Sequence, residues 1–268
     1  MIKAKKSLGQ HFLVDTAALK RIAEAANIRD GDEVIEIGPG TGLLTRELLR
    51  TELKRLIAYE VDDRAIEVLQ QEIHDPRFEL RHEDFLQADV QAVRRSDVPT
   101  MRVVGNIPYY ITSPIIFKLI DDRKFISDAV LLVQLEVAER LTAEPRTKAY
   151  GIPSVLTNFF GEVEFLFKIK AESFRPAPKV DSALIRIDFA KGYFERNQLS
   201  KPEGFDDEAF RKLVRTSFGM RRKTLRNNLK AVVDEALLKE AEIAPFLPRR
   251  AEELTVEEFI RLYRLISK

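Results

Sequence analysis

The order of hydrophobic and polar positions in the first half of the chain predicts strands and helices that alternate. Five short apolar segments have strand character, at residues 33–37, 56–60, 78–82, 101–105 and 129–133. Around them, helical periodicity predicts helices at 15–26, 43–50, 63–73 and 112–119, the first with Asp15 as its cap and the last with Pro114 in its first turn. Such alternation is typical of an α/β fold whose parallel sheet is covered on both faces.

The second half of the chain has a different pattern. A helix near 154–160 is followed by two β-rich segments, 163–169 and 182–189, which we expect to form a hairpin that closes the edge of the sheet. Residues 192–204 are polar and loosely patterned, and helices are expected beyond them at 206–217, 223–233, 235–240 and 256–267. We therefore predict an α/β domain over residues 1–191 and a small all-α domain over residues 192–268.

Composition narrows the class of protein. The chain has 268 residues, of which 45% are hydrophobic and 32% charged, as in a soluble globular protein. No apolar stretch is long enough to span a membrane, and the first residues lack the apolar core of a signal peptide. There is no cysteine, and the three histidines are scattered without ligand spacing. We therefore expect a cytoplasmic protein with no membrane segment and no metal site.

The formal net charge of +1 conceals an uneven distribution of charge. The first ten residues carry Lys3, Lys5 and Lys6 without a carboxylate. A longer basic segment contains no acidic residue and consists of Arg211, Lys212, Arg215, Arg221, Arg222, Lys223, Arg226 and Lys230. A surface of one sign on a nearly neutral protein indicates a polyanionic partner, although a solvated helix face is the alternative.

The first predicted strand ends in a glycine-rich loop, Gly38-Pro39-Gly40-Thr41-Gly42. Such a loop lets a ligand approach the backbone at a helix N-terminus. A dinucleotide-binding fingerprint would have its third glycine at position 43, where this chain has leucine, and a phosphate-binding P-loop would carry a lysine. The loop therefore favours a nucleoside ligand without a pyrophosphate.

Two carboxylates fit the same ligand. Glu60 ends the second strand, where it could accept hydrogen bonds from both hydroxyls of a ribose, and Asp84 follows the third strand, where it could receive an adenine amino group. Taken alone, Glu60 could be a surface carboxylate and Asp84 a turn former. Together with Gly38 and Gly40 they indicate S-adenosylmethionine as the cofactor.

The segment Asn106-Ile107-Pro108-Tyr109 follows the fourth apolar strand and places an amide oxygen, a main-chain carbonyl and an aromatic face side by side. Pro108 prevents the chain from continuing as a regular helix or strand. These groups suit a planar base with an exocyclic amino group, because the ring could stack on Tyr109 while oxygens of Asn106 and of the main chain near Ile107 or Pro108 accept both amino protons. An ordinary Asn-Pro turn is the alternative.

These motifs resemble, in order, those of the ribosomal RNA adenine N6-dimethyltransferases. The resemblance rests on the segment Lys6-Ser7-Leu8-Gly9-Gln10-His11-Phe12-Leu13, the glycine loop, Glu60, Asp84, the Asn106–Tyr109 segment and Phe-Arg-Pro-Ala-Pro-Lys-Val-Asp-Ser at 174–182. It spans nearly the whole chain. It is strongest to the small-subunit branch (KsgA type), because residues 217–229, with Arg221-Arg222-Lys223-Thr224-Leu225, look like the C-terminal domain of that branch.

The resemblance implies a Rossmann-like class I methyltransferase sheet, mostly parallel with a C-terminal antiparallel hairpin, and a helical C-terminal RNA-binding domain. It also implies that His11 and Leu13 line the cofactor site, completed by Gly38, Gly40, Glu60, Asp84 and Asn106. Position 11 is asparagine in some relatives, so the contact there could be made largely by the backbone. Without the resemblance, His11 would be taken for a surface histidine in a mobile arm.

The implied activity is dimethylation of N6 on two adjacent adenosines, in a loop near the 3′ end of small-subunit (16S) ribosomal RNA. It implies a role in small-subunit biogenesis and, as partner, the RNA or the immature 30S particle; we expect a monomer. The implied catalytic residues are Asn106, Pro108, Tyr109 and Phe174, with Phe174 packed on the adenine opposite Tyr109 or, alternatively, in the plain hairpin core. RNA phosphates would be held by Arg221, Arg222, Lys223 and Arg226.

Three alternatives remain open from the sequence. The chain could be a large-subunit dimethyltransferase of the macrolide-resistance type, which shares the catalytic domain but not residues 217–229. It could also be an assembly factor that recognises immature small subunits and is mainly non-catalytic. A nicotinamide-dependent oxidoreductase is disfavoured by the position of the third glycine and by the basic C-terminal segment.

Overall fold

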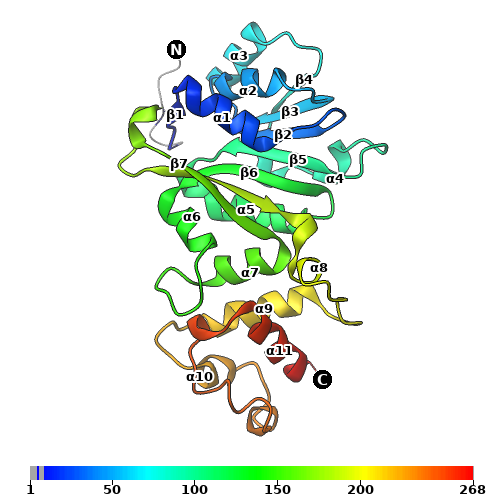
Figure 1. Ribbon diagram of the computed structural model, residues 1–268, viewed down its shortest axis with the longest axis vertical. Coiled ribbons are helices and arrows are strands. Elements are labelled where there is room, and N and C mark those ends of the chain that lie inside the picture. Colours follow the sequence, from blue (N-terminus) through cyan, green and yellow to red (C-terminus); the bar gives the residue numbers. More distant parts are fainter. Residues whose placement is uncertain (1–4, 6–8, 268) are drawn as a thin grey trace. The chain divides into compact units, whose positions relative to one another are not determined.

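The computed structural model describes residue 5 and residues 9–267, and they form two compact units (Figure 1). One unit comprises the described residues up to Ala138 together with Val163–Ala190, and the other comprises Glu139–Glu162 and the residues from Lys191 onward. Residues 139–162, which we assigned to the first domain, thus group with the C-terminal helices. Our predictions for Lys3, Lys6, Ser7 and Leu8 lie outside the described residues.

The first unit is built on a seven-stranded sheet with the order β4-β3-β2-β5-β6-β9-β7. The pairs β2–β3, β3–β4, β2–β5 and β5–β6 are parallel, and β9 is antiparallel to β6. This arrangement confirms the predicted mostly parallel sheet. The strands are β2 (Glu33–Ile37), β3 (Arg55–Glu60), β4 (Phe78–His82), β5 (Met101–Asn106), β6 (Ile126–Gln134), β7 (Glu162–Ile169) and β9 (Ser182–Asp188).

Helices cover both faces of the sheet, since every residue of β2 is buried. The helices of this unit are α1 (Thr16–Ala26), α2 (Leu43–Leu49), α3 (Asp63–Glu72), α4 (Val90–Val93) and α5 (Thr112–Asp121), and the division between the two units falls within α6 (Leu135–Leu141). The predicted cap of α1 is confirmed, because the Asp15 carboxylate accepts hydrogen bonds from the N–H groups of Ala17 and Ala18. In α5, Thr112 lies inside the first turn, and its hydroxyl bonds the Tyr109 carbonyl.

A separate two-stranded sheet joins distant parts of the chain. Strand β1 (Phe12–Leu13) pairs antiparallel with β8 (Phe174–Arg175), so that Leu13 lies opposite Phe174. The Val14 N–H donates to the Ser173 carbonyl at 3.0 Å and continues the pairing. Strands of two residues have no periodic pattern, and neither was predicted from the sequence.

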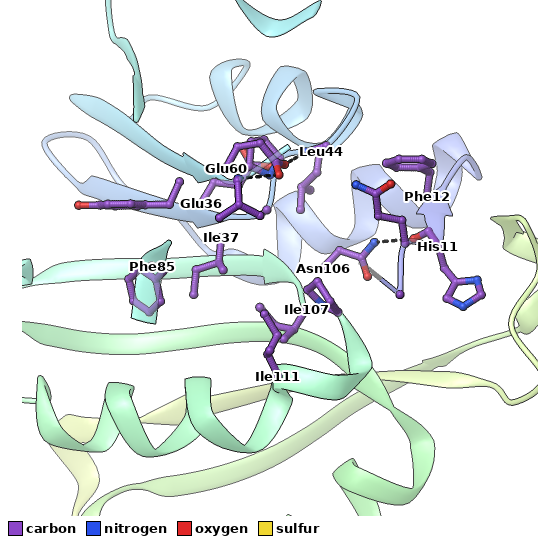
Figure 2. Close-up of a pocket in the computed structure, with 18 of the residues that line it drawn as sticks. His11, Phe12, Glu36, Ile37, Leu44, Glu60, Phe85, Asn106, Ile107 and Ile111 are labelled. Carbon is purple, nitrogen blue, oxygen red and sulfur yellow. Dashed lines mark hydrogen bonds between the residues drawn. The ribbon is translucent and has the colours of Figure 1, made fainter. Parts of the chain in front are cut away.

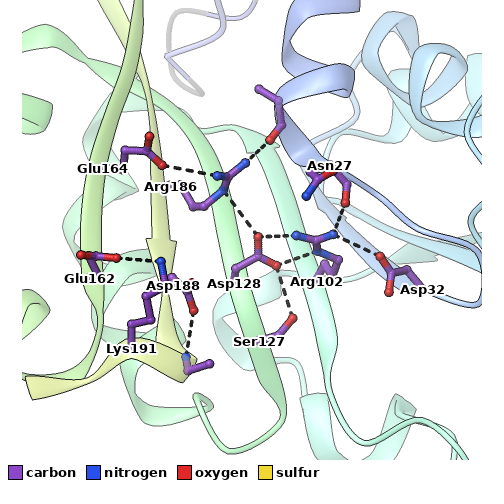
Figure 3. A network of polar contacts seen from close by, with 12 residues as sticks. Asn27, Asp32, Arg102, Ser127, Asp128, Glu162, Glu164, Arg186, Asp188 and Lys191 are labelled. Carbon is purple, nitrogen blue, oxygen red and sulfur yellow. Dashed lines mark hydrogen bonds and ion pairs between the residues drawn. The ribbon is translucent and has the colours of Figure 1, made fainter. Parts of the chain in front are cut away.

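A network of ion pairs stabilises the end of the sheet at which β5 and β6 begin (Figure 3). Arg102 binds Asp128 through two hydrogen bonds of 2.7 Å and also reaches Asp32, which precedes β2, at 3.1 Å. Arg186 of β9 lies 3.8 Å from the same Asp128 carboxylate. The side chains of Arg102 and Asp128 are largely buried. Their hydrogen-bonded ion pair, together with Arg186, connects β5, β6 and β9 at this end of the sheet. The carboxyl ends of the parallel strands lie at the opposite end, where a site can form.

The second unit is helical and has an aromatic core. Phe159 lies 4.2 Å from Phe210 between ring centroids, and Phe205 lies 4.5 Å from Tyr263. Since Phe159 belongs to α7, this core explains why residues 139–162 group with the C-terminal helices. The helices are α7 (Ile152–Phe160), α8 (Tyr193–Arg196), α9 (Asp207–Ser217), α10 (Leu225–Leu229) and α11 (Val256–Ile266).

Two predictions for this unit were only partly right. The helix expected at 223–233 is shorter, since α10 spans only Leu225–Leu229, and the N–H groups of Leu225 and Arg226 at its start donate to the carbonyls of Arg249 and Leu247. The helix expected at 235–240 is a single 3₁₀ turn, Leu237–Lys239. Within the described residues, no helix is long and apolar enough to cross a membrane.

Candidate functional site

A cavity of about 240 Å³ lies at the carboxyl ends of β2, β3 and β5, where the glycine loop and the N-terminal segment meet (Figure 2). The carboxyl ends of parallel strands are the usual place for ligands in such sheets. Nine of the residues predicted for the site line this cavity: His11, Leu13, Gly38, Gly40, Glu60, Asp84, Asn106, Pro108 and Tyr109.

The glycine loop needs its glycines for reasons of space and conformation. Gly40 has φ +56°, and a Cβ atom there would lie 3.0 Å from the Phe12 ring. Gly42 has φ +74°, and its Cβ would lie 2.8 Å from Leu69 of α3. The third glycine therefore stands at position 42 because α3 packs against the loop at that point.

Glu60 is held by the backbone around it. Its Oε2 accepts a hydrogen bond from the Gly40 N–H at 3.0 Å, and its Oε1 accepts from the N–H groups of Val61 and Asp62 at 2.9 and 3.0 Å. A carboxylate offers about four acceptor positions, so about one remains, on Oε2. In this arrangement Glu60 has room for one ligand hydroxyl, and a second would have to displace a backbone bond.

Asp84 is exposed and caps a short 3₁₀ turn, Phe85–Gln87, by accepting a hydrogen bond from the Leu86 N–H at 3.0 Å. This contact uses Oδ1. The residue is therefore a turn former and also lines the cavity, so the two readings of Asp84 are compatible.

Glu36 is a cavity residue that the sequence analysis missed. It is 1% exposed, and burial, aided by the nearby charge of Glu60, raises the pKa of its carboxyl to about 8. Its Oε2 has no hydrogen-bond partner among the described residues. A glutamate between two isoleucines in the interior of a buried strand was the available signal, because such a position calls for a neutral or paired acid.

Asp62 was also missed, since it reads as an ordinary helix cap. Its side chain is 0% exposed and bonds Arg64, Gln10 at 2.9 Å and Lys5 at 3.1 Å. The hydrogen bonds from Arg64, and then those from Gln10 and Lys5, hold the pKa of Asp62 far below its usual range. The carboxylate thereby ties the N-terminal segment to the start of α3.

Asn106 is oriented by the N-terminal segment. Its side-chain nitrogen donates to the His11 carbonyl at 3.2 Å (Figure 2). Because a carbonyl only accepts, this contact assigns the nitrogen to that side and leaves Oδ1 as the free acceptor at the cavity. The Asn106 oxygen, and not its nitrogen, is therefore available to a ligand in the cavity.

Tyr109 has a fixed ring at the same end of the cavity. Its hydroxyl forms a hydrogen bond of 2.9 Å with the Ser182 hydroxyl, and burial raises its pKa. The carbonyl of Pro108 already accepts the Ile111 N–H at 3.1 Å. Of the two main-chain acceptors considered for the base, the carbonyl of Ile107 is therefore favoured.

Phe174 is not where we expected it. It is 0% exposed, belongs to a hydrophobic cluster with Leu13, Leu19 and Ile22, and is not among the residues that line the cavity. Its pairing with Leu13 turns the ring into the core. The placement beside an adenine is therefore corrected, and the alternative of plain core packing describes Phe174.

The predicted RNA-binding residues belong to the second unit and differ in their surroundings. Arg221 forms an ion pair of 2.9 Å with Glu252 and also donates to the Lys148 carbonyl. Arg222, Lys223 and Arg226 are exposed, and the described part of the chain gives them no ion-pair partner. Of the four predicted residues, these three therefore have charges that no described carboxylate pairs with.

Comparison with known proteins identifies the relatives of this chain. A family model described as ribosomal RNA adenine dimethylase matches residues 1–268. The ribosomal RNA small subunit methyltransferase A of Chlorobium phaeobacteroides is 40% identical over 263 residues, which cover 98% of this chain and 94% of the relative. The protein of the same name from a Geobacillus species is 42% identical over 273 residues, with coverages of 96% and 90%.

Two solved structures share the architecture. A dimethyladenosine transferase from Plasmodium falciparum matches with a TM-score of 0.78 and 27% identity, covering 94% of this chain and 96% of that chain. The 23S rRNA methyltransferase ErmE matches with a TM-score of 0.66 and 29% identity, with coverages of 96% and 100%. The predicted class I methyltransferase fold and family resemblance are both confirmed. The chain belongs to the ribosomal RNA adenine dimethylase family.

Proposed function

We propose that this protein uses S-adenosylmethionine to dimethylate the N6 amino groups of adenines in small-subunit ribosomal RNA. Membership of the adenine dimethylase family and relatives named small subunit methyltransferase A support the proposal. The observation that carries it is the orientation of Asn106, whose nitrogen is held by His11 so that its oxygen and the Tyr109 ring meet at one cavity.

The cavity fits the proposed cofactor. A Cβ at Gly40 would meet the Phe12 ring at 3.0 Å, so this position has no room for a side chain. The loop therefore presents its backbone to the ligand. Glu60 retains one acceptor position for a ribose hydroxyl, and the buried Oε2 of Glu36 is an unused polar atom. The bound cofactor would supply an electrophilic methyl group. We assign its binding to His11, Leu13, Gly38, Gly40, Glu60, Asp84 and Asn106, with Glu36 added.

The acceptor end of the cavity suits an aromatic amine. The lone pair of adenine N6 is delocalised into the ring, which makes the amine a poor nucleophile. Acceptance of its two N–H bonds by Asn106 Oδ1 and the Ile107 carbonyl favours a pyramidal nitrogen with its lone pair directed at the methyl group. Alignment and preorganised acceptors of this kind lower the barrier by several kcal/mol, roughly.

A neutral amide also suits a second methylation. After the first transfer the nitrogen has one hydrogen left, so one acceptor loses its partner. An aspartate at position 106 would then be an unpaired charge in a confined site, whereas the Asn106 carboxamide is uncharged. The Tyr109 ring is the stacking surface for the base, worth about 1–3 kcal/mol.

The finer substrate assignment belongs to the same proposal. An adenine in a duplex cannot enter such a cavity, so the target is a splayed base in a loop, and we propose two adjacent adenosines near the 3′ end of the small-subunit RNA. Arg222, Lys223 and Arg226 would hold phosphates, with Arg221 as a secondary contact because it is paired with Glu252. We propose a monomeric cytoplasmic enzyme that needs no metal and acts on this RNA or the immature 30S particle.

Labelled S-adenosylmethionine tests the proposal directly. The protein is incubated with small subunits that lack the modification, with naked small-subunit RNA and with large-subunit RNA, and the labelled nucleotide is mapped by digestion. We expect N6-dimethyladenosine at neighbouring positions in small-subunit RNA. Label in large-subunit RNA alone would support the macrolide-resistance alternative, and tight binding of small subunits without transfer would support an assembly factor.

A further inference from the structure

The His11 imidazole covers a face of Tyr109. The two ring centroids are 5.5 Å apart and the planes are inclined by 25°, which is a stacked arrangement. Both side chains line the cavity, and Tyr109 is the residue on which the proposed base would stack. One aromatic ring of this chain therefore lies where the proposed function requires a ring of the substrate.

The contacts of His11 divide into two sets. Its main chain is fixed, because its carbonyl accepts from Asn106 at 3.2 Å, the neighbouring β1 pairs with β8, and Gln10 bonds the buried Asp62. Its side chain is only partly buried and has one hydrogen bond, from Nδ1 to the Pro176 carbonyl at 2.8 Å. The imidazole can therefore rotate away while the backbone that orients Asn106 stays in place.

Tyr109 cannot avoid His11 by turning. Its hydroxyl is held by a hydrogen bond of 2.9 Å to the Ser182 hydroxyl. A half-turn of the ring about the axis through its hydroxyl exchanges two equivalent faces, so the face toward His11 stays covered. A base that stacks on the face covered by His11 therefore has to take the place of the imidazole.

We infer that His11 is a gate of the base-binding end of the cavity: its ring occupies the Tyr109 face until the adenine replaces it. The inference rests on the proposed function, since it assumes that the target base stacks on Tyr109. The free-energy change of this exchange is small, because the stack of adenine on Tyr109 replaces the stack of His11. The imidazole loses its hydrogen bond to the Pro176 carbonyl and gains one to water. His11 is then a positioning residue that controls access to the site.

The gate lowers the apparent affinity for the base. When a binding-competent state is populated for only a fraction of the time, the observed dissociation constant rises by the inverse of that fraction. A stacked aromatic pair shifts such an equilibrium by about 2- to 10-fold. Removal of the imidazole should therefore strengthen base binding by about the same factor.

Magnetic resonance of the histidine rings tests the gate, because the chain has only three histidines, His11, His74 and His82. In the free protein, the ring current of Tyr109 should move the His11 signals upfield of those of the exposed His74. Tyr109→Leu should remove this displacement, and His11→Asn and His74→Asn assign the signals. Addition of adenosine with S-adenosylhomocysteine should return the His11 signals toward unstacked values.

Affinity measurements give a second readout. His11→Asn keeps the main-chain carbonyl that orients Asn106 and removes the ring, so adenosine should bind about 2- to 10-fold more tightly than to the wild type. The gain should be absent in the double variant with Tyr109→Leu, and His74→Asn should bind as the wild type does.

Two results would overturn the gate. If the Tyr109 ring signals respond to adenosine while the His11 signals stay in place, the base binds without displacing the imidazole, and the proposed function survives alone. If neither responds at saturating adenosine, the gate and the proposed base site both fail.

Discussion

The Gly40 N–H donates a hydrogen bond of 3.0 Å to the Glu60 carboxylate, and this contact joins two motifs that lie 20 residues apart in the sequence. The glycine loop after β2 and the acidic end of β3 are thereby locked into one unit before any ligand arrives. Preorganised polar groups cost little to order when a ligand binds. The pair therefore provides both a rigid loop and a correctly aimed acceptor.

Glu60→Gln should weaken cofactor binding and destabilise the fold. An amide offers a single acceptor oxygen, so its NH2 group would face one of the backbone N–H groups that the carboxylate now satisfies. An unsatisfied buried donor costs about 1–3 kcal/mol, and we expect the affinity for S-adenosylhomocysteine to fall about 10-fold or more. Calorimetric titration and urea unfolding measure the two effects. Glu67→Gln on the exposed side of α3 is the matched control, and equal behaviour of both variants would contradict the assigned role.

Asn106→Ala should abolish methyl transfer while RNA binding is retained. Removal of one preorganised acceptor typically lowers the rate about 10²- to 10³-fold. Asn106→Asp should be impaired more in the second transfer than in the first, so that monomethyladenosine accumulates. Transfer of tritiated methyl groups, followed by separation of the two products, measures both effects. Wild-type turnover in the alanine variant would remove Asn106 from the mechanism.

The buried acid Glu36 should make stability depend on pH. The unfolded chain releases this proton near the ordinary value of 4.5, whereas the folded protein holds it up to a pKa of about 8. Between these values the folded state binds more protons, so the free energy of unfolding falls as the pH rises, by at most about 1.4 kcal/mol per pH unit. Glu36→Gln should flatten this decline in urea unfolding between pH 5 and 8. Parallel profiles for the wild type and the variant would show that Glu36 is already ionised.

Neutralisation of the exposed cations should reduce the salt dependence of RNA binding. Arg222, Lys223 and Arg226 changed together to Gln should lower affinity and reduce the slope of log K against log salt by about 2, since each phosphate contact contributes roughly 0.7 to 0.9. Filter binding over a range of salt concentrations gives the slope. Lys239→Gln is a control in the same unit, because Lys239 is paired with Glu235. An unchanged slope in the triple variant would place the RNA on another surface.

Long periodic segments were predicted well from the sequence. The expected strands at 33–37 and 78–82 coincide with β2 and β4, and the glycine loop, Glu60 and the Asn106–Tyr109 segment were placed at one end of the sheet, where they line one cavity. The mainly apolar residues of β2 and the alternating apolar and polar residues at the start of β4 are local patterns that specify a strand. Neighbouring strands of a parallel sheet have their carboxyl ends at the same edge, so the residues that follow these strands lie close together.

Features decided by distant contacts were not predicted. The stack of His11 on Tyr109 was not foreseen, and the choice between the two placements of Phe174 stayed open, because both depend on the pairing of β1 with β8, which no local pattern encodes. Glu36 is an ordinary strand residue by its sequence pattern, and its burial near the charge of Glu60 marks it as a site residue. The helix expected at 223–233 spans only Leu225–Leu229, and its first N–H groups donate to the carbonyls of Leu247 and Arg249, which no local pattern indicates.

The pairing of Phe12–Leu13 with Phe174–Arg175 has a consequence during synthesis of the protein. The second of these strands is translated some 160 residues after the first, a delay of roughly 10 to 30 seconds at ordinary elongation rates. Until then the strand pairing that fixes the main chain next to His11 is missing, and so is the Pro176 carbonyl that the His11 ring contacts. An unfinished chain, still attached to the machine that makes it, therefore cannot assemble the pocket with which the finished enzyme would modify ribosomal RNA.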